Sequence, residues 1–176
     1  MADKQSLRDF QSQLAEKLKA AQAATGPSSK LGFIAGGRHW LVSLEQINEV
    51  VSVPELIAVP WAQPWFSGIA SVRGALYGCT DLGAFLEIAE ALPQGEAHLL
   101  LAHPRFGVNA ALRIERTLGL RALDSLSQEA APAAATPWVA GLWRSLDDQI
   151  WTELNVEKLV ASPAFLEAGL QLDTFA

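Results

Sequence analysis

Cysteine is nearly absent from this chain of 176 residues, which contains a single one, Cys79. One cysteine excludes an internal disulfide framework. Cys79 lies in an apolar stretch without a CxxC partner, so we expect a small buried hydrophobic side chain rather than a nucleophile. Metal ligands are also sparse, because the three histidines are scattered and lack carboxylate neighbours at metal-ligand spacing. The sequence therefore predicts neither a cofactor nor a metal.

Motifs of catalysis and nucleotide binding are missing too. The chain has no GxGxxG stretch, no GxxxxGK[ST] loop and no GxSxG context around a serine. The paired carboxylates Asp147 and Asp148 are explained by a turn between two strands. We therefore expect no catalytic residue and no enzyme. One alternative stays open: Glu49, Arg73 and Asp81 could line the mouth of a β-barrel and carry out acid/base chemistry.

Positive charge is in deficit, with 13 basic residues against 19 acidic ones and a net charge of −6. Without a basic stripe, a nucleic acid or an anionic membrane surface is a poor partner. No apolar run reaches the roughly 18 residues of a membrane span, and the N-terminal stretch lacks the apolar core of a signal peptide. The expected location is therefore the cytoplasm, without direct insertion into a membrane.

Half of the residues are hydrophobic and 18% are charged, which suits a chain that buries a core. We expect two parts: an amphipathic helix and linker over residues 1–29, and one folded domain over residues 30–176. The helix is indicated by apolar residues at spacings of three and four, which are Leu7, Phe10, Leu14, Leu18 and Ala21. It either packs on its own domain or docks on a partner.

Short β-strands with frequent turn signals dominate the rest of the chain. LGFIA and HWLVSL flank Gly36–Gly37, which predicts a hairpin. INEVVSV predicts a strand, and GIASVRG and ALYGC predict two strands that meet at Gly74. DLGAFLEI predicts a helix capped by Thr80 or Asp81.

The second half has the same style. Three short strands are expected in AHLLLAH, FGVNAAL and RTLGLRAL, and an Ala/Pro-rich loop over residues 127–137. A hairpin through Asp147–Asp148 follows, then a helix capped by Asn155 and a last helical turn in SPAFLEAGL. This pattern favours β-barrels or a sandwich, and two small barrels that share one core suit the length.

Six tryptophans are many for this length. Four lie on expected strands and are assigned to the core, namely Trp40, Trp138, Trp143 and Trp151. The other two, Trp61 and Trp65, lie in the connection VPWAQPWFSG and are better candidates for interface anchors. A small-ligand-binding barrel that uses these tryptophans is the second alternative, and it requires an open apolar cavity.

Four of these stretches resemble the CheW family of chemotaxis coupling proteins. They are INEVVSV with its central Glu49, GIASVRG, TDLGAFL and NVEKLV, and the resemblance runs from about residue 30 to residue 161. Two positions depart from the family pattern: Ser71 stands where an asparagine is usual, and Gly78 where a proline is usual. The tryptophan-rich connection and the N-terminal helix look like the PilI-type branch, whose coupling proteins serve type IV pilus twitching motility.

The resemblance implies a mainly β, CheW-like fold: two SH3-like, five-stranded barrels around a shared hydrophobic core, with an N-terminal helix and short C-terminal helices. It also implies a non-catalytic adaptor that couples a membrane chemoreceptor to a CheA-type histidine kinase. One barrel would bind the regulatory domain of the kinase, and the groove between the barrels would receive the cytoplasmic tip of the receptor.

The family's partner-binding positions fall here on Ile47, Glu49, Gly68, Arg73 and Gly74. Glu49 and Arg73 look like the family's salt-bridged pair. Ile47 and Glu49 are two residues apart, so on a regular strand they share a face. If the pair is buried, losing one partner costs about 3–5 kcal/mol, and if it is exposed the cost is about 0–1 kcal/mol. The sequence leaves both possibilities open.

Overall fold

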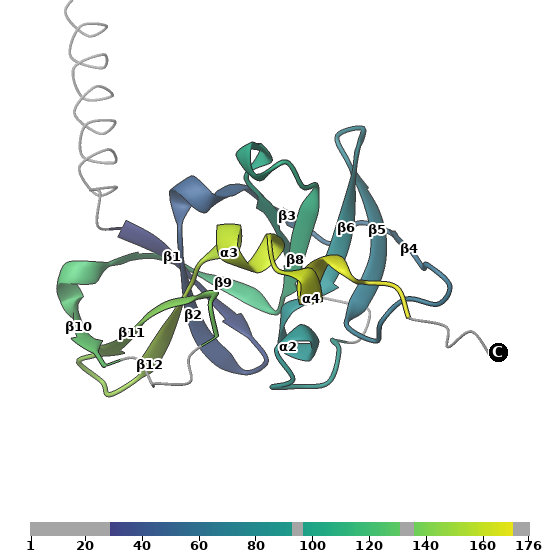
Figure 1. Ribbon diagram of the computed structural model, residues 1–176. Coiled ribbons are helices and arrows are strands. Elements are labelled where there is room, and N and C mark those ends of the chain that lie inside the picture. Colours follow the sequence, from purple (N-terminus) through teal and green to yellow (C-terminus); the bar gives the residue numbers. More distant parts are fainter. Residues whose placement is uncertain (1–28, 93–96, 131–135, 171–176) are drawn as a thin grey trace, which may run out of the picture.

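The structure is a computed structural model that describes residues 29–92, 97–130 and 136–170, folded into two six-stranded sheets that lie side by side (Figure 1). The predicted N-terminal amphipathic helix lies outside the described residues. The first sheet has the order β10-β11-β12-β2-β1-β9. Its strands are β1 (Ser29–Ala35), β2 (Arg38–Ser43), β9 (Arg116–Ala122), β10 (Leu126–Glu129), β11 (Val139–Ser145) and β12 (Ile150–Leu154).

The second sheet has the order β3-β7-β8-β6-β5-β4. Its strands are β3 (Ile47–Ser52), β4 (Leu56–Ile57), β5 (Phe66–Val72), β6 (Ala75–Asp81), β7 (His98–Ala102) and β8 (Ala110–Ile114). The helices are short: α2 (Leu82–Phe85), α3 (Val156–Val160), α4 (Pro163–Leu166) and the 3₁₀ turns η1 (Leu44–Gln46), η2 (Pro104–Phe106) and η3 (Leu123–Ser125).

Each sheet curls round on itself. The two edge strands of the first sheet, β9 and β10, are joined by the three residues of η3. The edge strands of the second sheet, β3 and β4, are likewise separated by only residues 53–55. Opposite edges of a six-stranded sheet can meet over so short a link only if the sheet closes towards a barrel.

The two halves of the chain follow the same path with the sheets exchanged. In the first half, β1 and β2 enter the first sheet and β3–β6 the second; in the other half, β7 and β8 enter the second sheet and β9–β12 the first. Each sheet also has one parallel contact, β12 with β2 and β6 with β8. The expected mainly β fold is confirmed, with six strands rather than five in each sheet because the short edge strands β4 and β10 are added.

Local sequence signals account for the turns and helix starts. Gly36 and Gly37 have φ of 58° and 67° and form the two-residue turn between β1 and β2, where both central residues need positive φ. Asp81 caps α2 by accepting a hydrogen bond from the Ala84 N–H at 3.0 Å. Asn155 caps α3 in the same way, through the Lys158 N–H at 2.9 Å.

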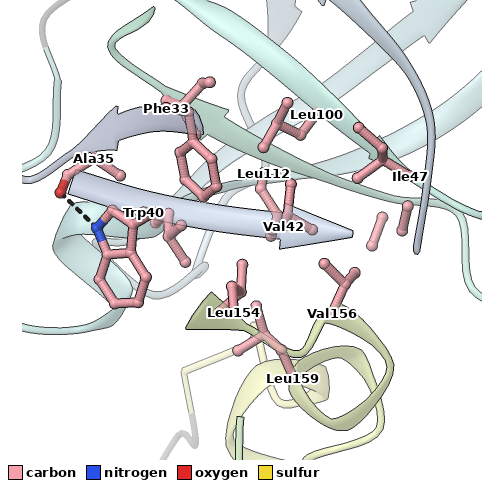
Figure 2. Packing of buried hydrophobic residues seen from close by; sticks show 14 of the residues in the cluster. Phe33, Ala35, Trp40, Val42, Ile47, Leu100, Leu112, Leu154, Val156 and Leu159 are labelled. Carbon is pink, nitrogen blue, oxygen red and sulfur yellow. Dashed lines mark hydrogen bonds between the residues drawn. The ribbon is translucent and has the colours of Figure 1, made fainter. Parts of the chain in front are cut away.

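The largest hydrophobic cluster lies between the sheets (Figure 2). It combines Phe33 and Val42 from the first sheet, Leu100 and Leu112 from the second, and Leu159 from α3. The Trp40 indole N–H within it donates to the Ala35 carbonyl at 3.0 Å. One core therefore holds both sheets together.

A second, smaller cluster fills the interior of the second sheet. Its members are Ala70, Tyr77, Cys79, Leu99, Leu101 and Ala111. Cys79 is fully buried, as predicted, and burial raises the pKa of its thiol to about 11.

Three local predictions need correction. The helix predicted over DLGAFLEI ends at Phe85, after four residues. The loop predicted from Ser127 is still strand as far as Glu129, because β10 pairs with β11. Of the tryptophans assigned to strands and core, Trp40 and Trp151 are buried and Trp143 is only partly buried, whereas Trp138 packs against the shared core from a turn before β11. No helix in the described part of the chain is long and apolar enough to cross a membrane.

Candidate interaction surface

Ile47 and Glu49 point to opposite faces of β3. Ile47 lies opposite Ala102, but Glu49 lies opposite Leu101, so a β-bulge places two residues of β3 against one of β7. Ala102 faces the shared core, and Leu101 faces the interior of the second sheet. The prediction that Ile47 and Glu49 share a face is therefore wrong. Ile47 is 9% exposed and packs in the shared core.

The apolar stretch GIASVRG suggested that Arg73 lies within a buried strand. The structure places Arg73 in a turn instead. Val72 of β5 pairs with Ala75 of β6, so Arg73 and Gly74 form the two-residue turn between the strands. Both have positive φ, 51° and 82°, as tight hairpin turns require. The Arg73 side chain is 78% exposed.

The structure brings the Arg73 and Glu49 side chains together. Arg73 Nη2 donates to Glu49 Oε1 at 2.5 Å, and the Glu49 side chain is 27% exposed. The contact joins the edge strand β3 to the tip of the β5–β6 hairpin, two elements that do not neighbour each other in the sheet. Because the arginine is exposed, we expect a contribution of about 0–1 kcal/mol to folding stability. The pair fixes the shape and charge of this end of the sheet more than it stabilises the fold.

Gly68 and Gly74 serve different purposes. Gly68 has φ of 124°, and a Cβ there would lie 2.4 Å from the Ile57 carbonyl oxygen, so glycine allows β4 to approach β5. A Cβ on Gly74 would have no neighbour within 4 Å. Space is therefore limiting at Gly68, whereas only the backbone conformation is restricted at Gly74.

The outer face of β4, β5 and β6 is apolar and exposed. Ile57 pairs with Ile69, Leu76 pairs with Ser71, and residues directly opposite one another project to the same side. Ile57 and Leu76 are 62% and 59% exposed, and Trp61, which follows β4, is 69% exposed. Large apolar side chains gathered on one face mark an interaction surface. We call Ile57, Trp61, Ile69 and Leu76 the outer strip.

A second ion pair, which no pattern in the sequence indicates, lies at the opposite end of β6. Asp81 and Arg113 are aligned across the parallel β6–β8 pair, with Arg113 Nη1 3.9 Å from Asp81 Oδ2. Their side chains are 1% and 5% exposed. Asp81 Oδ2 also accepts from the Leu92 N–H at 2.8 Å, and Arg113 Nη1 donates to the Leu92 carbonyl at 2.7 Å. The pair thus clamps the segment that follows α2.

The geometry weighs against the acid/base alternative and against a ligand inside the second sheet. Asp81 is buried against Arg113, whereas Glu49 and Arg73 meet at the hairpin tip, so the three groups required for acid/base chemistry are not brought together. The interior of the second sheet is filled by six buried side chains, Ala70, Tyr77, Cys79, Leu99, Leu101 and Ala111. In the described residues, no group of three or more His, Cys, Asp or Glu side chains could hold a metal ion.

The described residues thus form two curled sheets around one core, with an exposed apolar face on the second sheet. Residues 30–164 match the model of the CheW-like domain. The chain therefore belongs to the CheW-like family, whose members are non-catalytic scaffold and adaptor proteins of chemosensory signalling that interact with chemoreceptors and CheA.

Two known proteins extend the comparison. The chain is 29% identical over 161 residues to protein PilI of Pseudomonas aeruginosa, and the match covers 89% of each chain. The crystal structure of the scaffolding protein TtCheW from Thermoanaerobacter tengcongensis superimposes with a TM-score of 0.65 at 16% identity, covering 79% of this chain and 91% of that one. The second likeness establishes the fold.

Proposed function

We propose that this chain couples the cytoplasmic tip of a membrane chemoreceptor to the regulatory domain of a CheA-type histidine kinase. The array it serves would control type IV pilus twitching motility, and the chain would work in the cytoplasm beside the receptor. Membership of the CheW-like family and the similarity to PilI support this assignment. The observation that carries it is the exposed outer strip, whose Leu76 lies three residues after Arg73 of the Glu49–Arg73 pair.

Coupling of this kind needs a surface rather than a pocket. The outer strip offers apolar area for a partner, and the Arg73 guanidinium beside it offers charge-assisted hydrogen bonds. Glu49 holds the guanidinium in place, Gly74 adds no side chain beside Arg73 in the turn, and Gly68 lets β4 pack close to β5. Ile47, being buried, would act only by positioning β3.

Isothermal titration calorimetry with the isolated kinase regulatory domain tests the proposal. We expect binding in the micromolar range and an affinity that falls at least about tenfold for Arg73→Ala, because truncating a charge at an interface removes both steering and hydrogen bonds. Leu146→Ala is the matched control, because Leu146 is 98% exposed in the β11–β12 turn of the other sheet. Absence of binding at high micromolar concentration would contradict the proposal, and so would unfolding of Arg73→Ala.

A further inference from the structure

Trp61, the most exposed residue of the outer strip, has an unusual backbone conformation. Its φ is 60°, a value that residues with a side chain rarely adopt, and 69% of the residue is exposed. No aromatic ring of the described residues packs against it. The orientation of its indole ring therefore depends on how the backbone of the connection between β4 and β5 is held.

A segment near the C-terminal end of the chain, residues 168–170, holds this connection through its backbone. The Leu170 N–H donates to the Trp61 carbonyl at 2.7 Å, and the Gln63 N–H donates to the Ala168 carbonyl, also at 2.7 Å. The two residues between these hydrogen bonds form an antiparallel bridge. The 168–170 segment thus forms a short ladder with the backbone on both sides of the bridge.

The 168–170 segment starts from a fixed point. From α4 the chain runs past β5 towards the connection that carries Trp61 (Figure 1). Phe165 of α4 is 5% exposed and belongs to the core cluster between the sheets. The Glu167 N–H donates to the Pro163 carbonyl at 2.9 Å, and only this residue separates α4 from the 168–170 segment. The ladder is therefore tied to the hydrophobic core.

The 168–170 segment also reaches the surface that the outer strip forms. Ala168 and Gly169 line a hollow of about 190 Å³ together with Trp61 and Ile69, which are both members of the strip. No charged residue is among the described residues that line this hollow. A displacement of the 168–170 segment would therefore change the shape of the outer strip at Trp61.

Trp61 is the residue of the outer strip best suited to anchor a partner. Tryptophan is enriched among the few interface residues that carry most of the binding free energy. An anchor of this kind contributes most when its orientation is set before the partner arrives, because ordering a loop or side chain on binding reduces the affinity. The two backbone hydrogen bonds of the ladder provide that order for Trp61.

We propose that the 168–170 segment positions Trp61 for binding, so that the affinity of the chain for its partner depends on this segment. The role rests on the proposed function, in which the outer strip binds the regulatory domain of the kinase. Trp61 contacts the partner, and the 168–170 segment acts by holding the backbone of Trp61.

Substitutions of Leu170 separate the backbone hydrogen bond from the side chain. Leu170→Pro removes the N–H that donates to the Trp61 carbonyl, whereas Leu170→Ala keeps it. In calorimetry with the kinase regulatory domain, Leu170→Pro should bind at least about tenfold more weakly than the parent chain and at least about fivefold more weakly than Leu170→Ala. Equal affinities of the two variants would overturn the proposal.

Two truncated chains locate the effect along the sequence. A chain that ends at Leu170 keeps the 168–170 segment and should bind within about twofold of the full chain, whereas one that ends at Glu167 should bind at least about tenfold more weakly. The shorter chain keeps α4 and the shared core, so its urea transition should stay cooperative. If both truncations weaken binding equally, residues 171–176 contact the partner and the proposal fails.

A double-mutant cycle tests whether the 168–170 segment acts through Trp61. Trp61→Ala should weaken binding at least about tenfold. In that background, Leu170→Pro should cost at most about twofold more, because no indole ring is left to position. If the effects of the two substitutions multiply, the 168–170 segment contacts the partner independently of Trp61, which contradicts a positioning role.

Fluorine NMR of the chain labelled with 5-fluorotryptophan reports on Trp61 without a partner. The Trp61 signal is identified by its loss in Trp61→Phe, and it should show the largest shift of the six tryptophan signals in Leu170→Pro. An unchanged Trp61 signal would overturn the positioning role. If the parent chain does not bind the kinase domain, the proposed function fails, and the fluorine spectrum still decides whether the 168–170 segment positions Trp61.

Discussion

The β5–β6 hairpin has one ion pair near each end, and the two differ in almost every physical respect. At the tip, Arg73 is 78% exposed and reaches Glu49 on a strand that is not its neighbour. At the base, Asp81 and Arg113 are 1% and 5% exposed and hold both backbone polar groups of Leu92. Exposed pairs contribute little to folding, whereas breaking a buried pair leaves an uncompensated charge. The difference predicts that the pair at the base contributes more to folding stability than the pair at the tip.

Asp81→Ala should produce the largest effect. It leaves Arg113 buried without its carboxylate, and it removes the acceptor for the Ala84 and Leu92 N–H groups. We expect a loss of about 3–5 kcal/mol in the free energy of unfolding, measured by urea denaturation. Asp81→Asn keeps the shape and one acceptor and should cost less. A loss below about 1 kcal/mol for the alanine variant would remove the contrast between the two ends.

Gly68→Ala should come next. The added methyl group would lie 2.4 Å from the Ile57 carbonyl oxygen at a backbone φ of 124°, so β4 must move away from β5. Strain of this type costs about 1–3 kcal/mol. Amide hydrogen exchange should show faster exchange in β4 and unchanged rates in β7 and β8. Uniform protection across the whole sheet would contradict the role assigned to Gly68.

Gly74→Ala tests the conformational requirement alone. Nothing lies within 4 Å of the added Cβ, but φ of 82° disfavours a residue with a side chain, so we expect a loss of about 1 kcal/mol. Gly74→Asn is the matched variant, because asparagine tolerates positive φ, and it should be closer to the parent in thermal denaturation. If the two substitutions are equally harmful, a steric role must replace the conformational one.

Arg73→Ala should have the smallest effect on folding, below about 1 kcal/mol, and Glu49→Ala should match it. A double-mutant cycle in urea should therefore give a coupling energy below about 1 kcal/mol. Arg73→Asn retains a residue suited to the turn and removes only the ion pair, which separates the backbone effect from the side-chain effect. A coupling energy above about 3 kcal/mol would show that the Glu49–Arg73 pair behaves as a buried ion pair, which would contradict its assignment as an exposed one.

Local chemistry determines the parts of the structure that can be predicted from the sequence. Gly36–Gly37 predicts its hairpin because glycine accepts positive φ, and Asn155 predicts its helix start because its side chain accepts from a backbone N–H. Both features depend on residues at most four positions apart. The Glu49 and Arg73 side chains were expected to meet only because the chain resembles a family, since 24 residues separate them.

Predictions from the sequence fail where two contacting residues are far apart in the chain or where a strand is irregular. Asp81 and Arg113 are aligned by the parallel β6–β8 register, and no local pattern reveals a parallel neighbour. The bulge in β3 reverses the face of Glu49 relative to Ile47, because one inserted residue breaks the alternation of side chains. Arg73 was expected within a strand because Val72 and Ala75 on either side of the turn are both apolar. The packing of Phe85 in α2 against the Trp138 ring, 53 positions later, also has no local signal in the sequence.

The β1–β2 hairpin belongs to a sheet whose other strands come from the second half of the chain. This arrangement sets the order in which the two sheets can close during synthesis. β2 forms a parallel pair with β12, and the registered residues Trp40 and Thr152 are separated by most of the domain. The first sheet therefore stays open on the ribosome until β12 has emerged, and β1–β2 must wait as an isolated hairpin, which is only marginally stable in water. The second sheet, whose strands all lie between Ile47 and Ile114, can close earlier. The second sheet, which carries the Glu49–Arg73 pair, would thus fold before the first sheet that packs against it.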